Sequence, residues 1–543
     1  MAEIIGWGSL PNVPRIMVEF TGGRPEVIAL MGGDWRHAAA RKAAAERRLG
    51  HLQRPGLGSA LRQGYGGRQL PELVERNLQA LDRDDTLAIV TGQQVGVLGG
   101  PLFTFYKALS AIMFAEALEP HAPGAVVPIF WMETADADFG EVNRISFPPD
   151  GDIPRRVAYN PADLVSGRSV SFHRLQAEIN PVLDEVRSWL QTQLNGAELG
   201  DLIAKSYMSG RLLADGFRDL MTELLGKWGL VMLDPQTPEL SLRATEFWER
   251  CLERPQRLNQ SFAMASRELE TMRLPLQVKM REDALPIMFL DEEGIRRRIH
   301  GTPEGWNIGK DGPAITVGEM LRVARERPGA LTPSALLRPL LQDWLLPTLA
   351  YVGGPAEISY QAQIGHAYDF LEIPRPLIAP RASLTLVERP MRRLLDKHGW
   401  KVMDVLGGRE LLLGRHGHSQ SLMEQFDHGS EQLKGWLERI ERASDEAGIN
   451  ITAEVDQAGR KLGYQWEKLA RIAKTKVENR DHTRLSHARL LCDGLMPDGM
   501  LQERHDNVLY YLAGYGDKLI ESIRTDVDLF HSNHLAIDLE PVV

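Results

Sequence analysis

One stretch of the chain, residues 86–143, constrains the fold more than any other, because it has the pattern of a strand, a glycine-rich loop, a helix and a second strand. Its first apolar run, Leu87 to Val90, is continuous rather than alternating, which is typical of a parallel strand buried on both faces. Ala125 to Trp131 has a similar composition. The stretch therefore predicts a right-handed βαβ unit, and ligands of such units bind at the carboxyl ends of the strands.

The loop after the first strand has the composition of an anion site. Four glycines between residues 92 and 100 precede Pro101, a residue favoured in the first turn of a helix, and the segment Phe103 to Leu118 has helical apolar spacing. The free N–H groups and the dipole at a helix start favour phosphate or carboxylate, and Thr104 and Lys107 can both lean toward that start. A purely structural turn remains the alternative, because the loop matches neither standard phosphate-binding pattern.

The end of the second strand carries a cluster of carboxylates. Its members are Glu133, Asp136, Asp138 and Glu141. They could receive an ammonium group, or a magnesium ion brought by a nucleotide, and Gln93 and Gln94 add amide groups at the neighbouring strand end. The alternative is a solvated acidic loop. Because the cluster and the glycine loop fall on adjacent strands, together they predict a ligand site.

Beyond this unit the chain is expected to leave the core and return to it twice. Insertions are predicted near residues 146–225 and 255–331, on either side of a core strand at 230–233. The core is expected to resume at Thr332, with a helix over residues 334–346.

A second glycine-proline helix start follows the predicted strand Leu349 to Val352. Gly353-Gly354-Pro355 repeats the pattern of the first loop, and Glu357 and Tyr360 lie three residues apart on the helix that it opens. Both side chains could therefore face one pocket. In the alternative interpretation, Glu357 is simply a favourable negative charge at a helix N-terminus.

The segment 374–386 is predicted to be the last core strand and brings three polar groups to one side. Arg381, Ser383 and Thr385 alternate, so an extended chain would present all three to a phosphate. The analogy is with synthetase-like enzymes, in which a basic loop after the last core strand stabilises phosphate charge, and a surface turn is the alternative. No histidine pair has metal-ligand spacing, so we predict no metal site within the protein itself.

From residue 391 to 496 the sequence predicts a separate helical domain. Its apolar residues recur at steps of three and four among abundant charges: Leu433, Leu437, Ile440, Val455, Ala458, Leu462, Trp466, Leu469 and Ala473. This spacing is typical of two long helices joined near residues 448–450. Packing between the two helices of the hairpin does not cover this narrow stripe of apolar residues completely, which favours a symmetric dimer. Residues 1–390 are assigned to the core, and residues 497–543 are expected to pack back on it.

Five segments, in order, carry a resemblance to a known family. They are TGQQVGVLGGPLFTFYK, VPIFWMETADADFGEVN, LLRPLLQDWLLPTLAYVGGPAEISY, PRASLTLVE and LQERHDNVLYYLAGYG. Together the segments resemble the bacillithiol-biosynthesis cysteine-adding enzyme family, BshC, whose members join cysteine to glucosaminyl-malate. The resemblance implies an α/β fold, with a Rossmann-like parallel-sheet core akin to class I aminoacyl-tRNA synthetases, connective insertions and an antiparallel coiled-coil hairpin that dimerises.

The resemblance also implies a reaction, the formation of an amide bond between the cysteine carboxyl and the amine of glucosaminyl-malate. A carboxylate does not acylate an amine unaided at neutral pH, so we expect activation by ATP, with Mg²⁺ accompanying the nucleotide. The chain departs from the family at one place. Where the family usually reads EDHDF, residues 135–139 here read ADADF, so that the glutamate and the histidine are both replaced by alanine. Both aspartates remain.

These arguments define a set of candidate site residues. The expected catalytic residues are Asp136, Asp138 and Lys107; the expected binding residues are Thr91, Gly92, Gln93, Gln94, Gly100, Thr104, Thr134, Asn143, Gly353, Gly354, Glu357, Tyr360, Arg381, Ser383 and Thr385. Two alternatives to the cysteine ligase stay open. The chain could be another ATP-dependent ligase or nucleotidyl transferase on the same core, or a catalytically silent dimeric scaffold, which the two alanines would favour.

The composition restricts which partners and which cellular compartment are expected. The net charge of −10 and pI near 5.9 argue against a broad nucleic-acid-binding surface and favour small-molecule substrates. The only cysteines, Cys251 and Cys492, exclude a disulfide scaffold and suit a reducing cytoplasm, where we expect the protein to reside. No apolar run approaches the ~18 residues that span a bilayer, so no membrane partner is expected.

Overall fold

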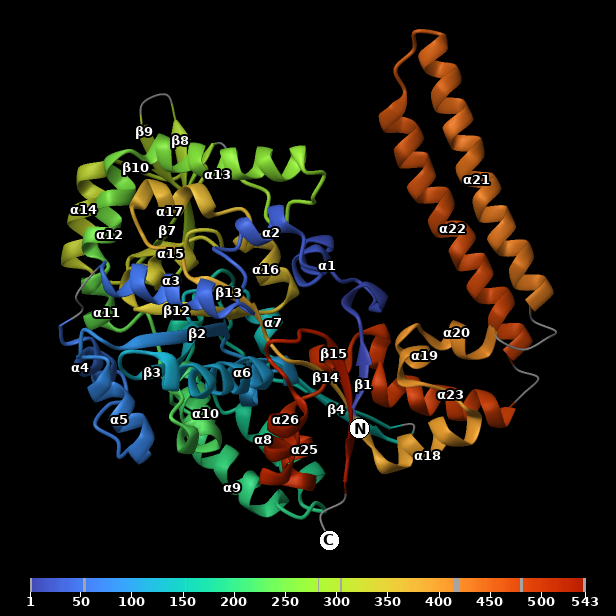
Figure 1. Ribbon diagram of the computed structural model, residues 1–543, viewed down its shortest axis with the longest axis horizontal. Helices are drawn as coiled ribbons and strands as arrows, with labels where there is room; N and C mark the ends of the chain where they lie inside the picture. The colour runs from blue at the N-terminus through green and yellow to red at the C-terminus, as the bar shows by residue number, and fades with distance from the viewer. Residues whose placement is uncertain are drawn as a thin grey trace. The chain divides into compact units, whose positions relative to one another are not determined.

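The computed structural model describes residues 2–51, 55–151, 153–281, 283–302, 305–414, 420–478 and 482–540. These residues form two compact units, which Figure 1 colours along the chain. The first unit contains the described residues up to Thr385 together with those from Gln502 onward, and the second runs from Leu386 to Leu501. The sequence placed the two boundaries at residues 390 and 496.

A five-stranded parallel sheet is the centre of the first unit. Its order is β13 (Leu377–Pro380), β12 (Thr348–Gly353), β2 (Leu87–Gln94), β3 (Val126–Glu133) and β6 (Val231–Leu233). Numbered along the chain, the strands lie in the order 3-2-1-4-5, which is the Rossmann order. The direction of winding therefore reverses between β2 and β12, and in such sheets the ligand crevice lies at the carboxyl ends of the strands at that reversal.

The predicted βαβ unit is the structural base of that crevice. β2 pairs with β3 from Leu87 opposite Val126 to Gln94 opposite Glu133, so that the two strands end side by side. The connecting helix α6 (Leu102–Leu118) is apolar around nearly its whole circumference and is buried against both strands. β2 continues two residues past Gly92, because glycine fits beside Trp131: a Cβ at residue 92 would lie 2.9 Å from the Trp131 carbonyl oxygen.

The second insertion forms an antiparallel sheet of its own. Its order is β10 (Ala314–Ile315), β9 (Gly305–Ile308), β8 (Arg296–Thr302), β7 (Ala284–Leu290) and β11 (Leu331–Pro333). This sheet corrects the prediction that the core resumes at Thr332, because Thr332 pairs with Met288 of β7 as part of a buried edge strand. The core resumes with α15 (Arg338–Leu345), which begins four residues after Ser334, and continues into β12.

The segment predicted as a single last strand is two strands. β13 completes the parallel sheet, whereas β14 (Ser383–Glu388) belongs to a three-stranded sheet with β15 (His534–Leu539) and β1 (Glu3–Ile5). Arg381 and Ala382 form the turn between β13 and β14. The C-terminal segment therefore supplies the neighbour of β14, and this neighbour decides which groups Ser383 and Thr385 meet.

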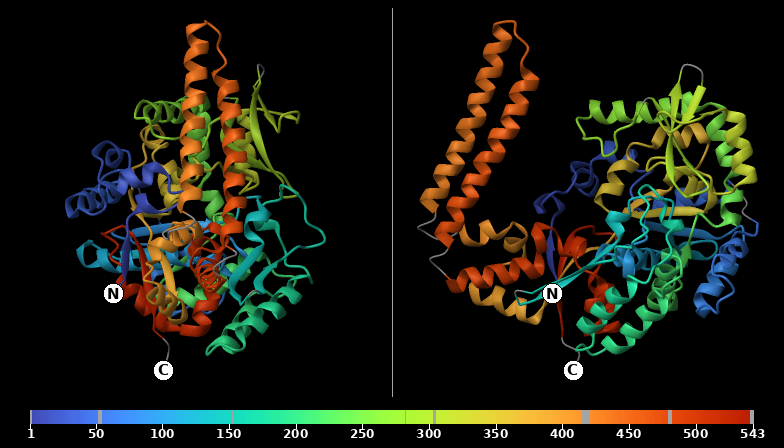
Figure 2. Two further views of the ribbon diagram at one scale, coloured as in Figure 1. Left: turned by 90° about the vertical axis from the view of Figure 1, so that its right-hand side faces the viewer. Right: turned by 180° about the vertical axis from the view of Figure 1, so that it is seen from behind.

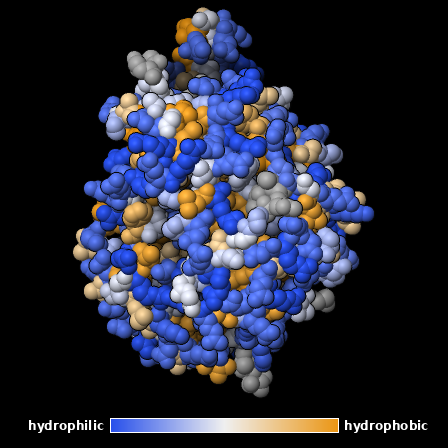
Figure 3. Space-filling view, turned by 90° about the vertical axis from the view of Figure 1, so that its left-hand side faces the viewer, coloured by the Kyte–Doolittle hydropathy of each residue, from blue (hydrophilic) through white to orange (hydrophobic). Residues whose placement is uncertain are grey.

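The other elements of the first unit surround these sheets (Figures 1 and 2). The hairpin strands are β4 (Arg144–Asp150) and β5 (Ile153–Ala158). The helices are α1 (Arg15–Thr21), α2 (Pro25–Ala29), α3 (Ala38–Leu49), α4 (Leu57–Gln63), α5 (Glu72–Ala80), α7 (Phe139–Val142), α8 (Ile179–Leu190), α9 (Gly196–Ser206), α10 (Leu213–Leu225), α11 (Pro238–Arg243), α12 (Thr245–Glu253), α13 (Pro255–Thr271), α14 (Val317–Glu326), α16 (Pro355–Gln361), α17 (Gly365–Leu371), α24 (Gln502–His505), α25 (Val508–Tyr515) and α26 (Asp517–Asp526). Figure 3 shows one face of this unit, where apolar residues are scattered in small groups among hydrophilic ones, as is ordinary for a globular surface.

The second unit consists of helices. They are α18 (Arg389–His398), α19 (Val402–Leu406), α20 (Arg409–Gly414), α21 (Gln420–Glu446), α22 (Thr452–Glu478) and α23 (His482–Leu495). α21 and α22 lie side by side in every view and form the predicted helical hairpin (Figures 1 and 2). Between them, the Trp466 ring packs at a tilt against Phe426, and its Nε1–H donates to the Phe426 carbonyl at 2.9 Å. Gly429 makes room for that indole, because a Cβ at residue 429 would lie 2.2 Å from the ring.

Apolar side chains also face outward from the hairpin. Trp436, Leu462, Leu469 and Ile472 are each between 42% and 51% exposed, and the two helices leave these four side chains uncovered. Among the described residues, no helix has the length and apolar character that crossing a membrane requires.

Candidate active site

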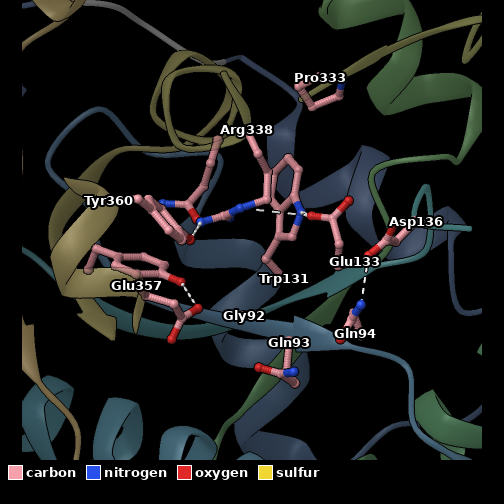
Figure 4. Close-up of polar contacts among 12 residues, drawn as sticks. Gly92, Gln93, Gln94, Trp131, Glu133, Asp136, Pro333, Arg338, Glu357 and Tyr360 are labelled. Atoms are coloured by element: carbon pink, nitrogen blue, oxygen red, sulfur yellow. Dashed lines mark hydrogen bonds and ion pairs between the residues drawn. The ribbon is translucent and has the colours of Figure 1, made fainter. Parts of the chain in front are cut away.

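A cavity of about 690 Å³ lies within the first unit, at the carboxyl ends of β2, β3 and β12. The lining residues are Gly92, Gln93, Gln94, Gly96, Pro101, Phe103, Thr104, Lys107, Trp131, Glu133, Asp136, Glu141, Val142, Gln277, Val278, Arg296, Pro333, Ser334, Ala335, Arg338, Gly354, Pro355, Ala356, Glu357, Tyr360, Arg381 and Arg504. The cavity is therefore at the reversal point of the Rossmann sheet, where ligands of such sheets bind. Figure 4 shows a group of these side chains converging from several elements.

The two glutamines at the end of β2 hydrogen-bond to charged side chains on opposite sides of the strand. The Gln94 amide donates to Asp136 Oδ2 at 2.7 Å (Figure 4). It also donates to Glu141 Oε2 at 2.8 Å. The Gln93 side-chain oxygen accepts from Lys107 Nζ at 2.7 Å. Gln94 therefore holds two of the predicted carboxylates together, and Gln93 holds the predicted lysine.

Lys107 is 2% exposed and lies at the cavity wall with all three of its donor directions engaged. Besides Gln93, its Nζ donates to the Gly92 carbonyl at 2.8 Å and pairs with Glu357 Oε2 at 2.6 Å. Burial lowers the pKa of Lys107 to about 8, against the opposing attraction of Glu357. The ammonium is thus a buried, matched charge that remains mostly protonated at neutral pH.

Glu357 combines the two roles that the sequence left open. At the start of α16 it accepts from the Gly354 N–H at 2.8 Å, which is the favourable helix-terminus charge, and it also lines the cavity. The Tyr351 hydroxyl donates to its other oxygen at 2.6 Å. Burial alone would raise the pKa of Glu357, but the Lys107 ammonium and these hydrogen bonds together hold the pKa below its ordinary value. Glu357 is therefore ionised.

Arg338 and Glu133 face each other across the cavity wall (Figure 4). Arg338 Nε lies 3.8 Å from Glu133 Oε2, and Arg338 Nη2 donates to the Tyr360 hydroxyl at 3.3 Å. The Trp131 indole N–H donates to the same Glu133 oxygen at 3.2 Å. Burial raises the pKa of Glu133 above its ordinary value, outweighing the attraction of Arg338 and Arg296. Glu133 is thus a carboxyl group that takes up a proton more readily than an exposed glutamate does.

The second insertion delivers a further arginine. Arg296, on β8, donates to Asp136 Oδ1 at 3.1 Å and to the Pro333 carbonyl at 2.6 Å. Asp136 is therefore held by Gln94 on one oxygen and by Arg296 on the other. A segment about 160 positions away along the chain thereby fixes the orientation of the predicted catalytic aspartate.

Arg381 lines the cavity, but its guanidinium is held by a carboxylate of the C-terminal segment. Its two terminal nitrogens donate to Glu503 at 2.9 and 2.6 Å, and both side chains are almost fully buried. Burial would raise the pKa of Glu503, yet Arg381 keeps it below its ordinary value. The pair is a permanent structural contact of the cavity wall.

Ser383 and Thr385 require a correction, because they lie outside the cavity lining. Both are on the same side of β14, as the alternation predicts, but that side faces β15 rather than the cavity. Ser383 donates to Glu503 Oε2 at 2.9 Å, and the two hydroxyls lie 2.8 Å from the ring nitrogens of His534. Burial lowers the pKa of His534 to about 4, so the ring is neutral.

The glycine loop before α6 also requires a correction. The first N–H of α6, from Leu102, donates to the Asp506 carbonyl at 2.7 Å, and the Asn507 amide donates to Leu98 and Gly100 carbonyls at 2.9 and 2.7 Å. The C-terminal segment therefore engages one of the N–H groups that the sequence offered to an anion, and it also holds two carbonyls of the loop. Thr104 stays at the cavity wall, and its buried hydroxyl has no hydrogen-bond partner among the described residues.

The remaining predicted residues hold the framework rather than line the cavity. Asp138 is exposed, at the start of α7, and is thereby separated from the Asp136 cluster. The hydroxyls of Thr91 and Thr134 donate to the Val352 carbonyl and to Asp234, and the Asn143 amide donates to Asn160 and the Tyr159 carbonyl. Gly100 precedes α6, and Gly353 is the last residue of β12; neither lines the cavity.

Several lining residues were not in the predicted set. They are Trp131, Glu133, Gln277, Arg296, Arg338 and Arg504. Glu133 had a usable signal, since it belongs to the acidic cluster, and Arg338 was a weaker candidate beside Lys279. Arg296 and Arg504 had no signal, because helical or strand spacing does not reveal which distant element an arginine reaches. No group of three or more histidine, cysteine, aspartate or glutamate side chains in the described part of the chain is arranged to hold a metal ion.

Comparison with known proteins assigns the family. The N-terminal Rossmann-like domain of bacillithiol biosynthesis BshC matches residues 9–382, and the C-terminal coiled-coil domain of BshC matches residues 384–539. This chain belongs to the BshC family. The predicted family is therefore confirmed, and so is the predicted fold class of a Rossmann-like parallel-sheet core with a coiled-coil domain.

Similar proteins cover most of the chain. A protein of Koribacter versatilis is 31% identical over 82% of this chain and 83% of its own length, and one of Solibacter usitatus is 30% identical over 84% and 85%. A protein of Salinibacter ruber is 29% identical over 95% of this chain and 94% of its own length. All three bear the name "Putative cysteine ligase BshC".

Proposed function

We propose that this BshC-family chain is a cysteine ligase that forms an amide bond between the carboxyl group of L-cysteine and the amine of glucosaminyl-malate, with activation by ATP. The observation that carries the proposal is the cavity at the reversal point of the Rossmann sheet, with charges of both signs in its wall. The names of the similar proteins support cysteine as the amino acid.

The residues present fit a phosphate-bearing nucleotide. Thr104 offers a buried hydroxyl without a partner among the described residues, at the positive end of the α6 dipole, and the Lys107 ammonium lies on the same helix. We assign the ATP phosphates to Thr104 and the Gly92 to Gln94 strand end. Lys107, whose three donors are taken by Gly92, Gln93 and Glu357, orients that strand end. ATP would supply the activation that turns a carboxylate oxygen into a leaving group. A magnesium ion would arrive with the nucleotide.

Asp136 and Glu141 are suited to bind an ammonium group. Both accept from the Gln94 amide, and the Arg296 contact leaves Asp136 anchored without neutralising Glu141. We assign the amino group of cysteine or the amine of the acceptor to this carboxylate pair, which lies beside the strand ends that hold the activated carboxyl group. This assignment keeps Asp136 of the predicted catalytic set and leaves the exposed Asp138 out.

Glu133 is suited to accept the proton that the amine loses as the carbon–nitrogen bond forms. Its pKa is raised by burial, which makes the carboxylate a better base, and Trp131 and Arg338 hold its orientation. In the EDHDF pattern, a histidine stands where this chain has Ala137. A proton acceptor on β3 gives this chain a route that does not need that histidine.

We also propose that the protein is a homodimer joined through the hairpin. The outward apolar side chains of α21 and α22 support the proposal, because a projecting hairpin gains stability when a second copy covers them. Leu469→Glu places a charge in that stripe and should give a monomer by light scattering at micromolar concentration. Lys468→Glu, at the neighbouring exposed position, should stay dimeric. A wild-type protein that is already monomeric contradicts the proposal.

The ligase activity is tested by incubating the protein with cysteine, a panel of amines including glucosaminyl-malate, and ATP with Mg²⁺, and by measuring coupled thiols by mass spectrometry. We expect the glucosaminyl-malate product and matching ATP consumption. Glu133→Gln should reduce turnover by a factor of about 10² or more, while Glu72→Gln on the α5 surface should not. A different amine consuming ATP reassigns the acceptor. The absence of any coupling, or coupling without a nucleotide, contradicts the proposal.

A further inference from the structure

One arginine of the cavity wall differs from all the others in its surroundings. Arg504 lies on α24 and contributes to the cavity lining, and it is exposed. Its neighbours along the chain are not: Gln502, Glu503, Asp506 and Asn507 are each at most 2% exposed. Arg504 is therefore an exposed cation at the cavity, carried by a segment whose other polar residues are mostly buried.

The buried neighbours fix the backbone that carries Arg504. Glu503 holds Arg381 on one side, and Asn507 holds the Leu98 and Gly100 carbonyls on the other. The Tyr511 hydroxyl donates to Asp506 at 2.8 Å between them. These contacts fix the backbone that presents Arg504 at the cavity rim.

The other cations of the cavity wall are already matched. Lys107 pairs with Glu357, Arg296 with Asp136, Arg338 with Glu133 and Arg381 with Glu503. Arg504 makes no hydrogen bond or ion pair with any residue that the structure describes. It is therefore the cation in this wall that remains available to an anionic group of a ligand.

We propose that Arg504 binds a carboxylate of the acceptor substrate, the malate end of glucosaminyl-malate, and thereby selects an acidic amine over a neutral one. This inference rests on the proposed ligase function and adds a specificity-determining residue to it. Arginine is always charged, and its planar fork matches a carboxylate. The reacting carboxyl of cysteine gives up its negative charge as the amide forms. The malate carboxylates keep theirs, so a fixed positive charge suits the malate end throughout the reaction.

The test compares Arg504→Gln with wild type on two acceptors, glucosaminyl-malate and methyl glucosaminide, which lacks carboxylates. Arg47→Gln, at an exposed arginine of α3 away from the cavity, is the matched control. We expect Arg504→Gln to raise the KM for glucosaminyl-malate about tenfold while leaving kcat, the KM for cysteine and the KM for methyl glucosaminide within about twofold. Arg504→Lys should recover part of the loss, because it restores the charge without the fork.

Binding measurements separate this inference from the ligase proposal. Calorimetric titration with glucosaminyl-malate and with malate alone needs no turnover, and the affinity of both should fall in Arg504→Gln. A tenfold rise in the KM for cysteine instead would assign Arg504 to the amino acid and overturn the proposal. Unchanged affinity for malate and glucosaminyl-malate would also overturn it, whether or not coupling is observed. Absence of coupling with the expected loss of affinity would contradict the ligase function only.

Discussion

Two turns with the same sequence pattern meet different surroundings in this protein. Gly99-Gly100-Pro101 precedes α6 and Gly353-Gly354-Pro355 precedes α16, and each follows a strand of the parallel sheet. The turn before α16 meets the cavity through Glu357, which holds Lys107. The turn before α6 is held from outside by Asp506 and Asn507 of the C-terminal segment.

The difference shows what a local pattern specifies and what it leaves to the rest of the chain. Both patterns produce a helix start at the carboxyl end of a strand. The groups that those starts contact are decided by segments far away in sequence. One turn therefore contributes directly to the chemistry of the cavity, and the other contributes by fixing the cavity wall. Substitutions that remove the contacts of one turn or the other should therefore have different effects.

The largest effect is expected on the side of the α16 turn. Glu357→Ala leaves the Lys107 ammonium buried without its counter-charge, and it should reduce the free energy of unfolding by about 3–5 kcal/mol in urea titrations. Replacing both partners, as Lys107→Met with Glu357→Leu, should recover part of that loss, because no buried charge remains. A loss below about 1 kcal/mol for Glu357→Ala would show that the pair is not buried as described.

The next effect concerns the C-terminal segment and depends on pH. The pKa of His534 is lowered to about 4 by burial, whereas an unfolded histidine titrates near 6.5, so the unfolded chain binds more protons between these values. Stability should therefore fall as the pH falls from about 6.5 to about 4, by about 3 kcal/mol from this group. His534→Gln should flatten that part of the stability profile. An unchanged profile would mean that another group causes the slope.

A smaller effect is expected at the turn before α6. Asn507→Ala removes the donor to the Leu98 and Gly100 carbonyls, and leaving buried carbonyls unsatisfied should cost about 2 kcal/mol. Gln79→Ala on the α5 surface is the control and should change stability by less than about 0.5 kcal/mol. If Asn507→Ala matches that control, the C-terminal segment does not hold the turn.

The smallest effect on stability is expected at the substituted family motif. Ala137 is partly exposed, so Ala137→His should change the free energy of unfolding by less than about 1 kcal/mol. Ala135 is 1% exposed, and we leave it unchanged because a glutamate there would be buried. If the family histidine assists catalysis, kcat should rise in Ala137→His. A lower kcat would show that this chain relies on Glu133 and not on a histidine at that position.

The sequence predicted those elements whose signal is local. Continuous apolar runs and the glycine-proline turns predicted β2, α6, β3, β12 and α16, and the heptad-like spacing predicted the hairpin of α21 and α22. Glu357 and Lys107 were in the predicted site set because each lies in the first two turns of a helix that follows a strand of the parallel sheet. Local spacing was sufficient for these residues.

The partners of those residues could not be read from the sequence. The pairing of Thr332 with Met288 of β7, the hydrogen bond from Arg296 to Asp136 and the contact of Arg381 with Glu503 all join residues that are 44 or more positions apart. Spacing along one element does not specify such contacts. For the same reason Ser383 and Thr385 had the predicted common side, but which neighbour that side meets depends on β15.

We propose above that ligation takes place in the cavity where the winding of the parallel sheet reverses, between β2 and β12. The most direct test is a crystal structure of the protein with glucosaminyl-malate, cysteine and a non-hydrolysable ATP analogue with Mg²⁺. We expect phosphate density at Thr104 beside the Gly92 to Gln94 strand end, and acceptor density between the Asp136 and Glu141 carboxylates and Arg504. Ligands bound only elsewhere on the protein, with the cavity empty under saturating conditions, would contradict it.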